Sequence, residues 1–218
     1  MSHDRILLKI KMDPFEELDI KIGNCKLCYE FSPLEKNPRL KRGKKSKIMV
    51  IGLSPGQRET EMGLAFSGQA GKKLFEWLKT AEIGLNEEII RDTIYLTSLI
   101  KCQKKDINDI SLMFINCQDY LKEQIKIVSP KIIITLGISV FNILFNKNLE
   151  TKDIVGKIFT FNEINETPMF PEMSIVYGLD YIIPLPHPSG LNRWLNDSGN
   201  KKHLETALDL LKKYNNEK

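Results

Sequence analysis

The chain has 218 residues, of which 42% are hydrophobic, and this is enough apolar material for the core of one domain. Its 32 Lys and Arg residues exceed its 28 Asp and Glu residues, so the formal charge is only +4. A weakly basic surface permits nucleic-acid binding without requiring it, and it excludes the strongly basic, histone-like class of proteins.

The first residues do not resemble a secretory signal. Charges interrupt the apolar run near the N-terminus, so it lacks the continuous apolar centre of a secretory signal. No stretch approaches the roughly 18 apolar residues of a membrane span. We therefore expect a soluble, cytoplasmic protein without membrane contact, whose four cysteines are thiols or metal ligands rather than disulfides.

Apolar runs and helical periodicity predict an alternating series of elements. Strands are expected at 48–51, 93–102, 131–137 and 181–190. Helices are expected at 14–28, 72–81, 111–129, 138–146 and 201–216. The six Lys and Arg residues between Arg39 and Lys47 indicate a solvated loop, and residues 151–180 resemble an irregular insertion.

Alternation of apolar strands with helices predicts an α/β protein, formed as a single domain over residues 1–218. The expected architecture is a three-layer α/β/α fold with a central, mostly parallel four-stranded sheet. In such folds the functional site lies beyond the carboxyl ends of the strands. We therefore expect three loops to converge on it, namely 52–71, 97–102 and 186–194.

The four cysteines form an uneven set. Cys25 and Cys28 make a C-x-x-C pair, whereas Cys102 and Cys117 stand alone. Structural zinc sites are usually formed by two close pairs or by a Cys-His finger, and neither is present. Thiolates from distant segments suit an iron–sulfur cluster or a less regular zinc site. Spacing alone leaves a cluster, zinc and unrelated buried cysteines all open.

Several segments together resemble a known family. They are GLSPGQRETEMGLAFSGQAGKKLFEWL, YLTSLIKC, the Cys102 to Cys117 spacing followed by PKIIITLG, and HPSGLNRW. In this order they are similar to the uracil-DNA glycosylase superfamily, in particular to its iron–sulfur families 4 and 5. The similarity covers most of the chain from Cys25 to the terminal helix.

The resemblance implies a DNA repair glycosylase of a prokaryotic nucleoid. Such an enzyme flips uracil or a related deaminated base out of damaged DNA and hydrolyses its N-glycosidic bond. We expect it to act as a monomer. The resemblance also implies a structural [4Fe–4S] cluster, held by the cysteines that match those of the family: Cys25, Cys28, Cys102 and Cys117.

The same resemblance implies roles for two side chains at the base. His187 matches the histidine that hydrogen-bonds the uracil O2 as charge accumulates there, and Phe66 matches the aromatic residue that stacks on the flipped base. The structural alternatives are a histidine fixed between two prolines and a core phenylalanine. The remaining expected pocket residues are Gly52, Leu53 and Ser98. Expected DNA contacts are Gly56, Ser189, Leu191 as a wedge, Asn192 and Arg193, although a generic surface turn also explains Leu191 and Arg193.

Two positions depart from the family. Leu53 stands where family 4 has the glutamate of G-E-x-P-G, and Ser98 stands where T-N-x-x-K-C has the asparagine that contacts uracil. The aspartate that family 5 uses further along corresponds to Gln69. The candidates to activate or orient the water are then Glu59, Gln57 and Ser54, and also Glu61 and Gln69. The alternative for Glu59 and Glu61 is that they are solvated carboxylates of a loop. A serine lacks an amide face, so discrimination between bases should relax.

Two other functions remain open from the sequence. The first is a homologue that binds DNA without glycosylase chemistry, which the missing glutamate and asparagine favour. The second is a small-molecule α/β enzyme with a zinc site.

Overall fold

The computed structural model describes residues 12–29, 46–103, 110–164 and 179–216. The strands are β1 (Ile48–Gly52), β2 (Tyr95–Ser98), β3 (Ile132–Leu136), β4 (Phe159–Thr160) and β5 (Tyr181–Leu185). The helices are α1 (Pro14–Asn24), α2 (Gln57–Met62), α3 (Gln69–Thr80), α4 (Glu87–Thr93), α5 (Ile110–Val128), α6 (Ile138–Phe145), α7 (Thr151–Ile154), α8 (Phe161–Ile164), the 3₁₀ helix η1 (Arg193–Asn196) and α10 (Ser198–Asn215). The basic stretch from Arg39 lies almost wholly outside the described residues.

The strands form one sheet in the order β2-β1-β3-β5-β4. The first four run parallel to one another, and β4 pairs with β5 in the antiparallel direction. The mostly parallel sheet is therefore confirmed, but it has five strands among the described residues rather than four. The prediction missed β4 because an edge strand of two residues is too short to show a sequence period.

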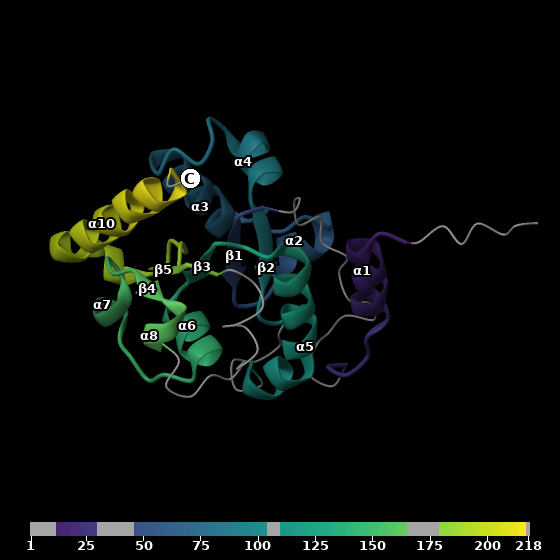
Figure 1. Ribbon diagram of the computed structural model, residues 1–218. Coiled ribbons are helices and arrows are strands. Elements are labelled where there is room, and N and C mark those ends of the chain that lie inside the picture. Colours follow the sequence, from purple (N-terminus) through teal and green to yellow (C-terminus); the bar gives the residue numbers. More distant parts are fainter. Residues whose placement is uncertain (1–11, 30–45, 104–109, 165–178, 217–218) are drawn as a thin grey trace, which may run out of the picture.

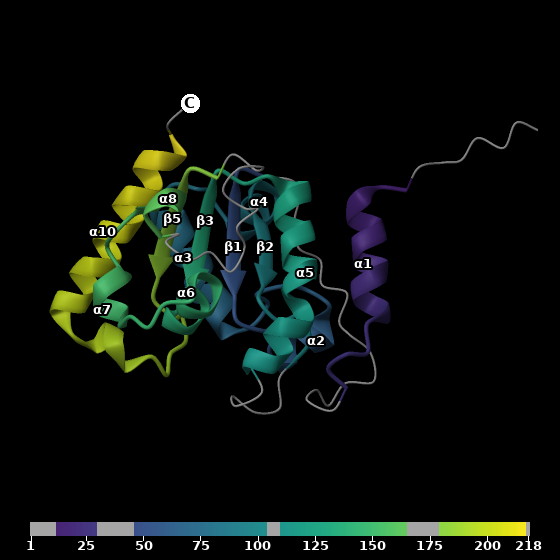
Figure 2. The ribbon, with the colours of Figure 1, turned by 60° about the horizontal axis from the view of Figure 1, so that its bottom comes forward.

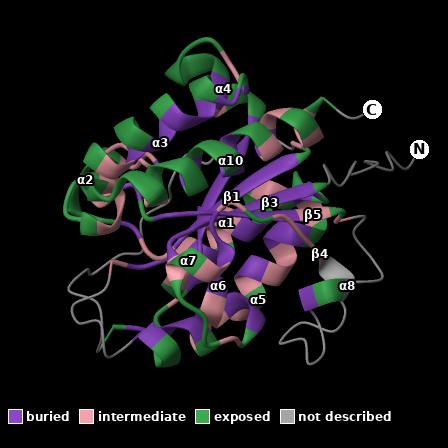
Figure 3. Cartoon of the chain, turned by 90° about the vertical axis from the view of Figure 1, so that its left-hand side faces the viewer, coloured by how far each residue is buried: buried purple, intermediate pink, exposed green. Residues whose placement is uncertain are grey.

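Helices cover both faces of the sheet, which confirms the three-layer fold. Figure 1 shows α3, α4 and α10 on one side and α5 and α6 on the other, with α1 beyond α5. Figure 2 shows the strands lengthwise and side by side, with α5 and α6 in front of the sheet. Ile48–Ile51 of β1 are at most 1% exposed, as expected for a strand covered on both faces. Figure 3 shows burial along the strands and the inner faces of the helices.

Several elements differ from the sequence prediction. The segment 52–71 contains α2, and the segment 151–180 contains α7, β4 and α8, while its residues 165–178 lie outside the described ranges. Helix α4 was not predicted. These helices are short and partly polar, so their apolar period is too brief to detect. In the described ranges, no helix has the length and apolar character needed to cross a membrane.

The register of the sheet determines where the site can form. Gly52 at the end of β1 lies beside Ser98 at the end of β2, and Leu136 of β3 lies beside Leu185 of β5. Four parallel strands therefore end along one edge, and the segments that leave them start close together.

Candidate active site

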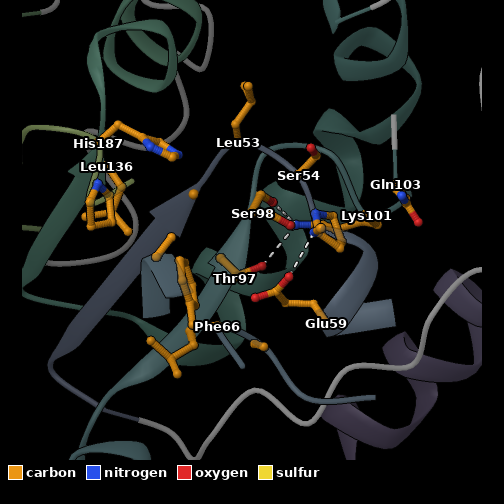
Figure 4. Close-up of a pocket in the computed structure, with 17 residues that line it drawn as sticks. Leu53, Ser54, Glu59, Phe66, Thr97, Ser98, Lys101, Gln103, Leu136 and His187 are labelled. Carbon is orange, nitrogen blue, oxygen red and sulfur yellow. Dashed lines mark hydrogen bonds between the residues drawn. The ribbon is translucent and has the colours of Figure 1, made fainter. Parts of the chain in front are cut away.

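A cavity of about 470 Å³ opens at this edge of the sheet. It is lined by Gly52, Leu53, Ser54, Pro55, Gly56, Glu59, Ala65, Phe66, Ala70, Leu96, Thr97, Ser98, Lys101, Gln103, Leu136, His187 and Pro188. Figure 4 shows His187 on one side and Lys101 on the other, with Phe66 below them in this view. The three loops expected to converge do meet here.

The Phe66 ring stands against the end of β1. A Cβ atom on Gly52 would lie 3.0 Å from Cζ of the ring, so no larger residue leaves room for it. A Cβ atom on Gly71, in the first turn of α3, would lie 1.9 Å from the Phe66 carbonyl oxygen. Phe66 itself has φ +52°, a left-handed conformation that costs free energy in a residue with a side chain. The two glycines and this strained residue together place the aromatic face in the cavity wall.

Glu59 lies in the cavity wall, and both of its carboxylate oxygens accept backbone hydrogen bonds. Oε2 accepts from the N–H of Gly56 at 3.1 Å, and Oε1 accepts from the N–H of Gly68 at 2.8 Å. The carboxylate therefore bridges the N-cap of α2 and the N-cap of α3. Such a bridge fixes the two ends of the loop that carries Phe66.

The other candidates for handling water are placed differently. Ser54 lines the cavity and is half-buried. Gln57 is exposed outside the cavity lining, and its amide donates to Oε1 of Glu61 at 2.8 Å. Gln69 is likewise exposed and lies outside the lining. Leu53 lines the cavity with an apolar side chain, so it places no carboxylate there.

His187 follows β5 and is oriented by its neighbours. Gly137 at the end of β3 has φ +89°, and a Cβ atom there would lie 3.2 Å from the Cβ of His187. The backbone N–H of Ser189 donates to Nδ1 of the imidazole at 3.2 Å, which assigns the ring proton to Nε2. Partial desolvation of the imidazole lowers the pKa of His187 below its ordinary value of about 6.5, although the residue as a whole is exposed. At neutral pH the ring is therefore an uncharged donor through Nε2.

Hydrogen bonds within the 186–194 loop fix its conformation around His187. Asn192 donates from Nδ2 to the carbonyl of His187 at 2.8 Å and accepts at Oδ1 from the N–H of Trp194 at 3.2 Å. Ser189 accepts at Oγ from the N–H of Leu191 at 3.2 Å. Leu191 projects outward and is 91% exposed. Of the DNA contacts expected from sequence, only Gly56 also lines the cavity; Ser189, Leu191, Asn192 and Arg193 lie outside its lining.

Lys101 is a site residue that the sequence prediction missed. Its side chain is buried, and Nζ donates to Oγ1 of Thr97 at 3.1 Å and to Oε1 of Gln124 at 2.7 Å, and also to the carbonyl of Ser98. The lysine of the T-N-x-x-K-C motif was the signal available. Ser98 itself donates from Oγ to the carbonyl of Ile100 at 2.7 Å, so its one proton is used within its own turn.

The four cysteines lie near one another although they come from distant segments. The thiols of Cys28 and Cys117 share a hydrogen bond, and the thiol of Cys25 is hydrogen-bonded to the hydroxyl of Tyr120 on α5. Cys102 is close enough to be affected by charge on Cys25 and Cys28. The packing of α1 against α5 accounts for this convergence.

The environment of the cysteines shifts their thiol pKa values in opposite directions. A hydrogen bond from the Cys117 thiol lowers the pKa of Cys28 to about 6, and sharing the same bond raises the pKa of Cys117. Burial raises the pKa of Cys102 to about 12, and negative charge at Cys28 and Cys25 adds to the effect. Thiolates that repel one another in this way are stabilised together by a shared cationic centre.

Two N–H groups point at these sulfurs. The backbone N–H of Lys101 donates to Sγ of Cys117 at 3.5 Å, and the Asn116 amide donates to Sγ of Cys28 at 3.6 Å. Bonds of this kind support metal-bound thiolates. Among the described residues, however, no group of three or more Cys, His, Asp or Glu side chains is arranged to hold a metal ion.

The sequence of this chain is similar to those of known proteins. The family model described as the uracil DNA glycosylase superfamily matches residues 40–212. The type-4 uracil-DNA glycosylase of Sulfurisphaera tokodaii is 33% identical over 154 residues, which cover 67% of this chain and 65% of that protein, slightly less than two thirds of its length. The type-4 enzyme of Saccharolobus solfataricus is 30% identical over 185 residues, or 82% of this chain and 77% of that protein.

A type-5 relative also matches over a shorter stretch. The type-5 uracil-DNA glycosylase of Pyrobaculum aerophilum is 26% identical over 101 residues, which cover 42% of this chain and 45% of that protein. The parallel sheet with its pocket at the carboxyl edge and the family match together assign the class. The chain belongs to the uracil-DNA glycosylase superfamily.

Proposed function

We propose that this protein is a DNA repair glycosylase that hydrolyses the N-glycosidic bond of uracil, or of a related deaminated base, in DNA. The observation that carries the proposal is a neutral His187, with its proton on Nε2, in the lining of the same cavity as Phe66 and Gly52, a cavity large enough for a base. Membership of the superfamily favours DNA over a small molecule as substrate.

Base recognition begins with the flipped nucleotide. Its base enters the cavity and stacks on Phe66, while the close approach of the ring to Gly52 sets the width of the slot. Exposed Leu191 fills the gap left in the base stack, and Arg193 contacts a phosphate. Asn192 and Ser189 act by holding the loop in shape.

Bond cleavage then depends on stabilising the leaving group. As the bond between C1′ and N1 breaks, its electron pair moves onto the base, and the Nε2–H of His187 donates to the oxygen where the negative charge develops. A neutral imidazole donates this hydrogen bond through Nε2–H and keeps its proton, because its N–H is far less acidic than that of an imidazolium. Water adds to C1′, the base takes up a proton, and the products are an abasic site and the free base.

Activation of the water is the weak part of this site. Glu59 uses both oxygens to hold the backbone, and Leu53 has no polar group. Of the residues proposed to position the water, this leaves Ser54 in that wall. Its hydroxyl can orient a water molecule but is not a strong base. We therefore assign most of the rate enhancement to His187 and to positioning of the substrate.

Base selectivity should be relaxed at Ser98. Its hydroxyl donates to the Ile100 carbonyl, so it offers the base only lone pairs. An asparagine would offer both a donor and an acceptor to the uracil edge. We propose that related deaminated bases are accepted beside uracil for this reason.

We also propose that Cys25, Cys28, Cys102 and Cys117 hold a [4Fe–4S] cluster. The convergence of four thiols and the N–H groups aimed at two of them support this. The cysteines that hold a four-iron cluster are farther apart than those that hold a single ion. This spacing suits the present cysteines, which are not arranged around one ion. When bound, the cluster supplies a structural cross-link between the α1 segment, the turn after β2 and α5. The whole chain is proposed to act as one intracellular, monomeric domain.

The test of function is a panel of oligonucleotides that contain uracil, hypoxanthine, xanthine or hydroxymethyluracil, incubated with the purified protein. We expect abasic product from uracil and from at least one other base. Absence of product from every substrate at high protein concentration would overturn the proposal. Tight binding of uracil DNA without cleavage would instead establish the binding homologue, which the apolar Leu53 and the internally bonded Ser98 favour.

The test of the cluster is separate. Protein purified without oxygen should be brown, with broad visible absorption and about four iron and four sulfide ions per chain. The Cys117→Ser variant should lose this absorption and unfold at a lower temperature. A colourless protein with stoichiometric zinc would contradict the cluster.

A further inference from the structure

Arg91 lies behind the cavity wall, and its guanidinium donates to backbone and carboxylate oxygens there. The residue belongs to α4, and its side chain is only 15% exposed. Nη1 donates to the carbonyl of Ala65 at 2.6 Å, and Nη2 donates to the carbonyl of Phe66 at 3.0 Å. One side chain thus joins two consecutive carbonyls of the loop that carries the aromatic residue.

The guanidinium is itself held in a single orientation. Nε and Nη2 both donate to Oε1 of Glu87, each at 2.8 Å, one turn earlier on the same helix. The Phe75 ring of α3 lies 4.4 Å from the Cζ atom of Arg91, in a cation–π contact. A planar fork fixed on two sides is suited to orient a pair of carbonyls, and a flexible ammonium is not.

The two carbonyls flank the strained residue of the wall. Phe66 has φ +52°, a conformation that residues with a side chain adopt only when the surroundings hold them there. A return to negative φ would turn the Phe66 ring away from Gly52. The carbonyl of Phe66 is also pressed against Gly71, so the loop has contacts on both sides.

We infer that Arg91 is a positioning residue for base stacking, which holds Phe66 in its left-handed conformation so that the ring faces the flipped base. This inference rests on the proposed function. Arg91 does not line the cavity and acts only through Phe66. It extends the site to α4, a helix that otherwise contributes nothing to the pocket wall.

The test compares Arg91→Met and Arg91→Lys with the control Glu88→Gln, which changes the charge of an exposed residue on the same helix. Arg91→Met removes the guanidinium, and Arg91→Lys keeps the charge without the planar fork. On a uracil-containing oligonucleotide we expect Arg91→Met to lower kcat/KM by about 10- to 100-fold, mainly through KM, as a displaced binding group does. Arg91→Lys should fall between it and the wild type, and Glu88→Gln should change kcat/KM less than about threefold.

Two further measurements separate positioning from general destabilisation. Hydrogen exchange at residues 64–71 should quicken in Arg91→Met, while exchange in the central strands stays unchanged. In the Phe66→Ala background, adding Arg91→Met should cost no further activity, because the group that Arg91 positions is already gone. Additive losses, or unchanged exchange at 64–71, would overturn the inference. So would unchanged kcat/KM in Arg91→Met.

These outcomes are distinct from failure of the proposed function. If the wild-type protein releases no base, the glycosylase proposal fails on that observation alone. Hydrogen exchange, which needs no substrate, then decides whether Arg91 holds the Phe66 loop, and unchanged exchange rejects the inference in that case too.

Discussion

The two sides of the cavity are built on opposite principles. On the Phe66 side, charged side chains hold the backbone in place. Glu59 accepts from two loop N–H groups, and Arg91 donates to two loop carbonyls. On the His187 side, the backbone orients a side chain, because the N–H of Ser189 fixes the imidazole proton on Nε2. The first arrangement builds a rigid surface for binding, and the second prepares a donor for chemistry.

The largest expected effect tests the chemical side. His187→Ala should lower kcat by about 100- to 1000-fold, the usual loss when a donor to a developing anion is removed. KM for uracil DNA should change little, since Phe66 still binds the base. Single-turnover cleavage measures the difference, with His203→Ala, an exposed histidine on α10, as the control. A loss confined to KM would mean that His187 belongs to binding instead.

The second prediction changes selectivity at the end of β2. Ser98→Asn should shift the preference toward uracil over hypoxanthine by about tenfold, because the amide supplies a paired donor and acceptor. Ser98→Ala serves as the control, since it loses the bond to the Ile100 carbonyl without adding an amide. The ratio of kcat/KM for the two bases is the measurement. An unchanged ratio in Ser98→Asn would show that this position does not contact the base.

The third prediction tests whether Glu59 belongs to the binding side. In Glu59→Gln, one backbone donor faces an NH₂ group in place of an oxygen, so the free energy of unfolding should fall by about 1–2 kcal/mol. The kcat should fall less than about tenfold, whereas loss of a general base costs about 100-fold or more. Denaturant unfolding and a pH–rate profile measure the two quantities. A 100-fold drop in kcat with the fold intact would return Glu59 to the role of base.

The smallest expected effect concerns pH. The lowered pKa of His187 keeps the ring neutral as pH falls below about 6.5, so kcat should stay level between pH 8 and 6.5. Between the lowered pKa and about 6.5, the unfolded chain binds a proton that the folded chain does not, so stability falls as pH falls through this window. Unfolding of wild type and His187→Ala across this range measures the difference. A rate that rises as pH falls from 8 to 6.5 would indicate a charged imidazole instead.

The main strands could be predicted from the sequence for a simple physical reason. Parallel strands buried on both faces are continuous apolar runs, as in Ile48–Ile51 and Ile132–Leu136, and such runs are recognisable without a structure. Their alternation with helices also indicated the layers and the edge where the site lies. Short elements gave no such signal. Helix α4, which carries Arg91, has seven residues and one buried side chain.

Residue types alone did not decide what the side chains do. Glu59 was a reasonable candidate base as a carboxylate in a loop, but its bonds depend on where the amides of Gly56 and Gly68 point. Gln57 lies next to the cavity in sequence, yet the first turn of α2 turns its amide toward Glu61. Lys101 was not among the predicted site residues, and only the packing of α5 places Gln124 against it.

Residue order was enough to predict the layered fold, the edge of the sheet that forms the site, and the family, because apolar periodicity and the succession of motifs are present before the chain folds. The direction of each polar group, in contrast, depends on the folded molecule. The proton on Nε2 of His187, the bridging carboxylate of Glu59 and the fork of Arg91 beneath Phe66 all depend on partners brought together by folding. A hydrogen bond needs a partner at a defined angle and distance, and neither can be read from residue order.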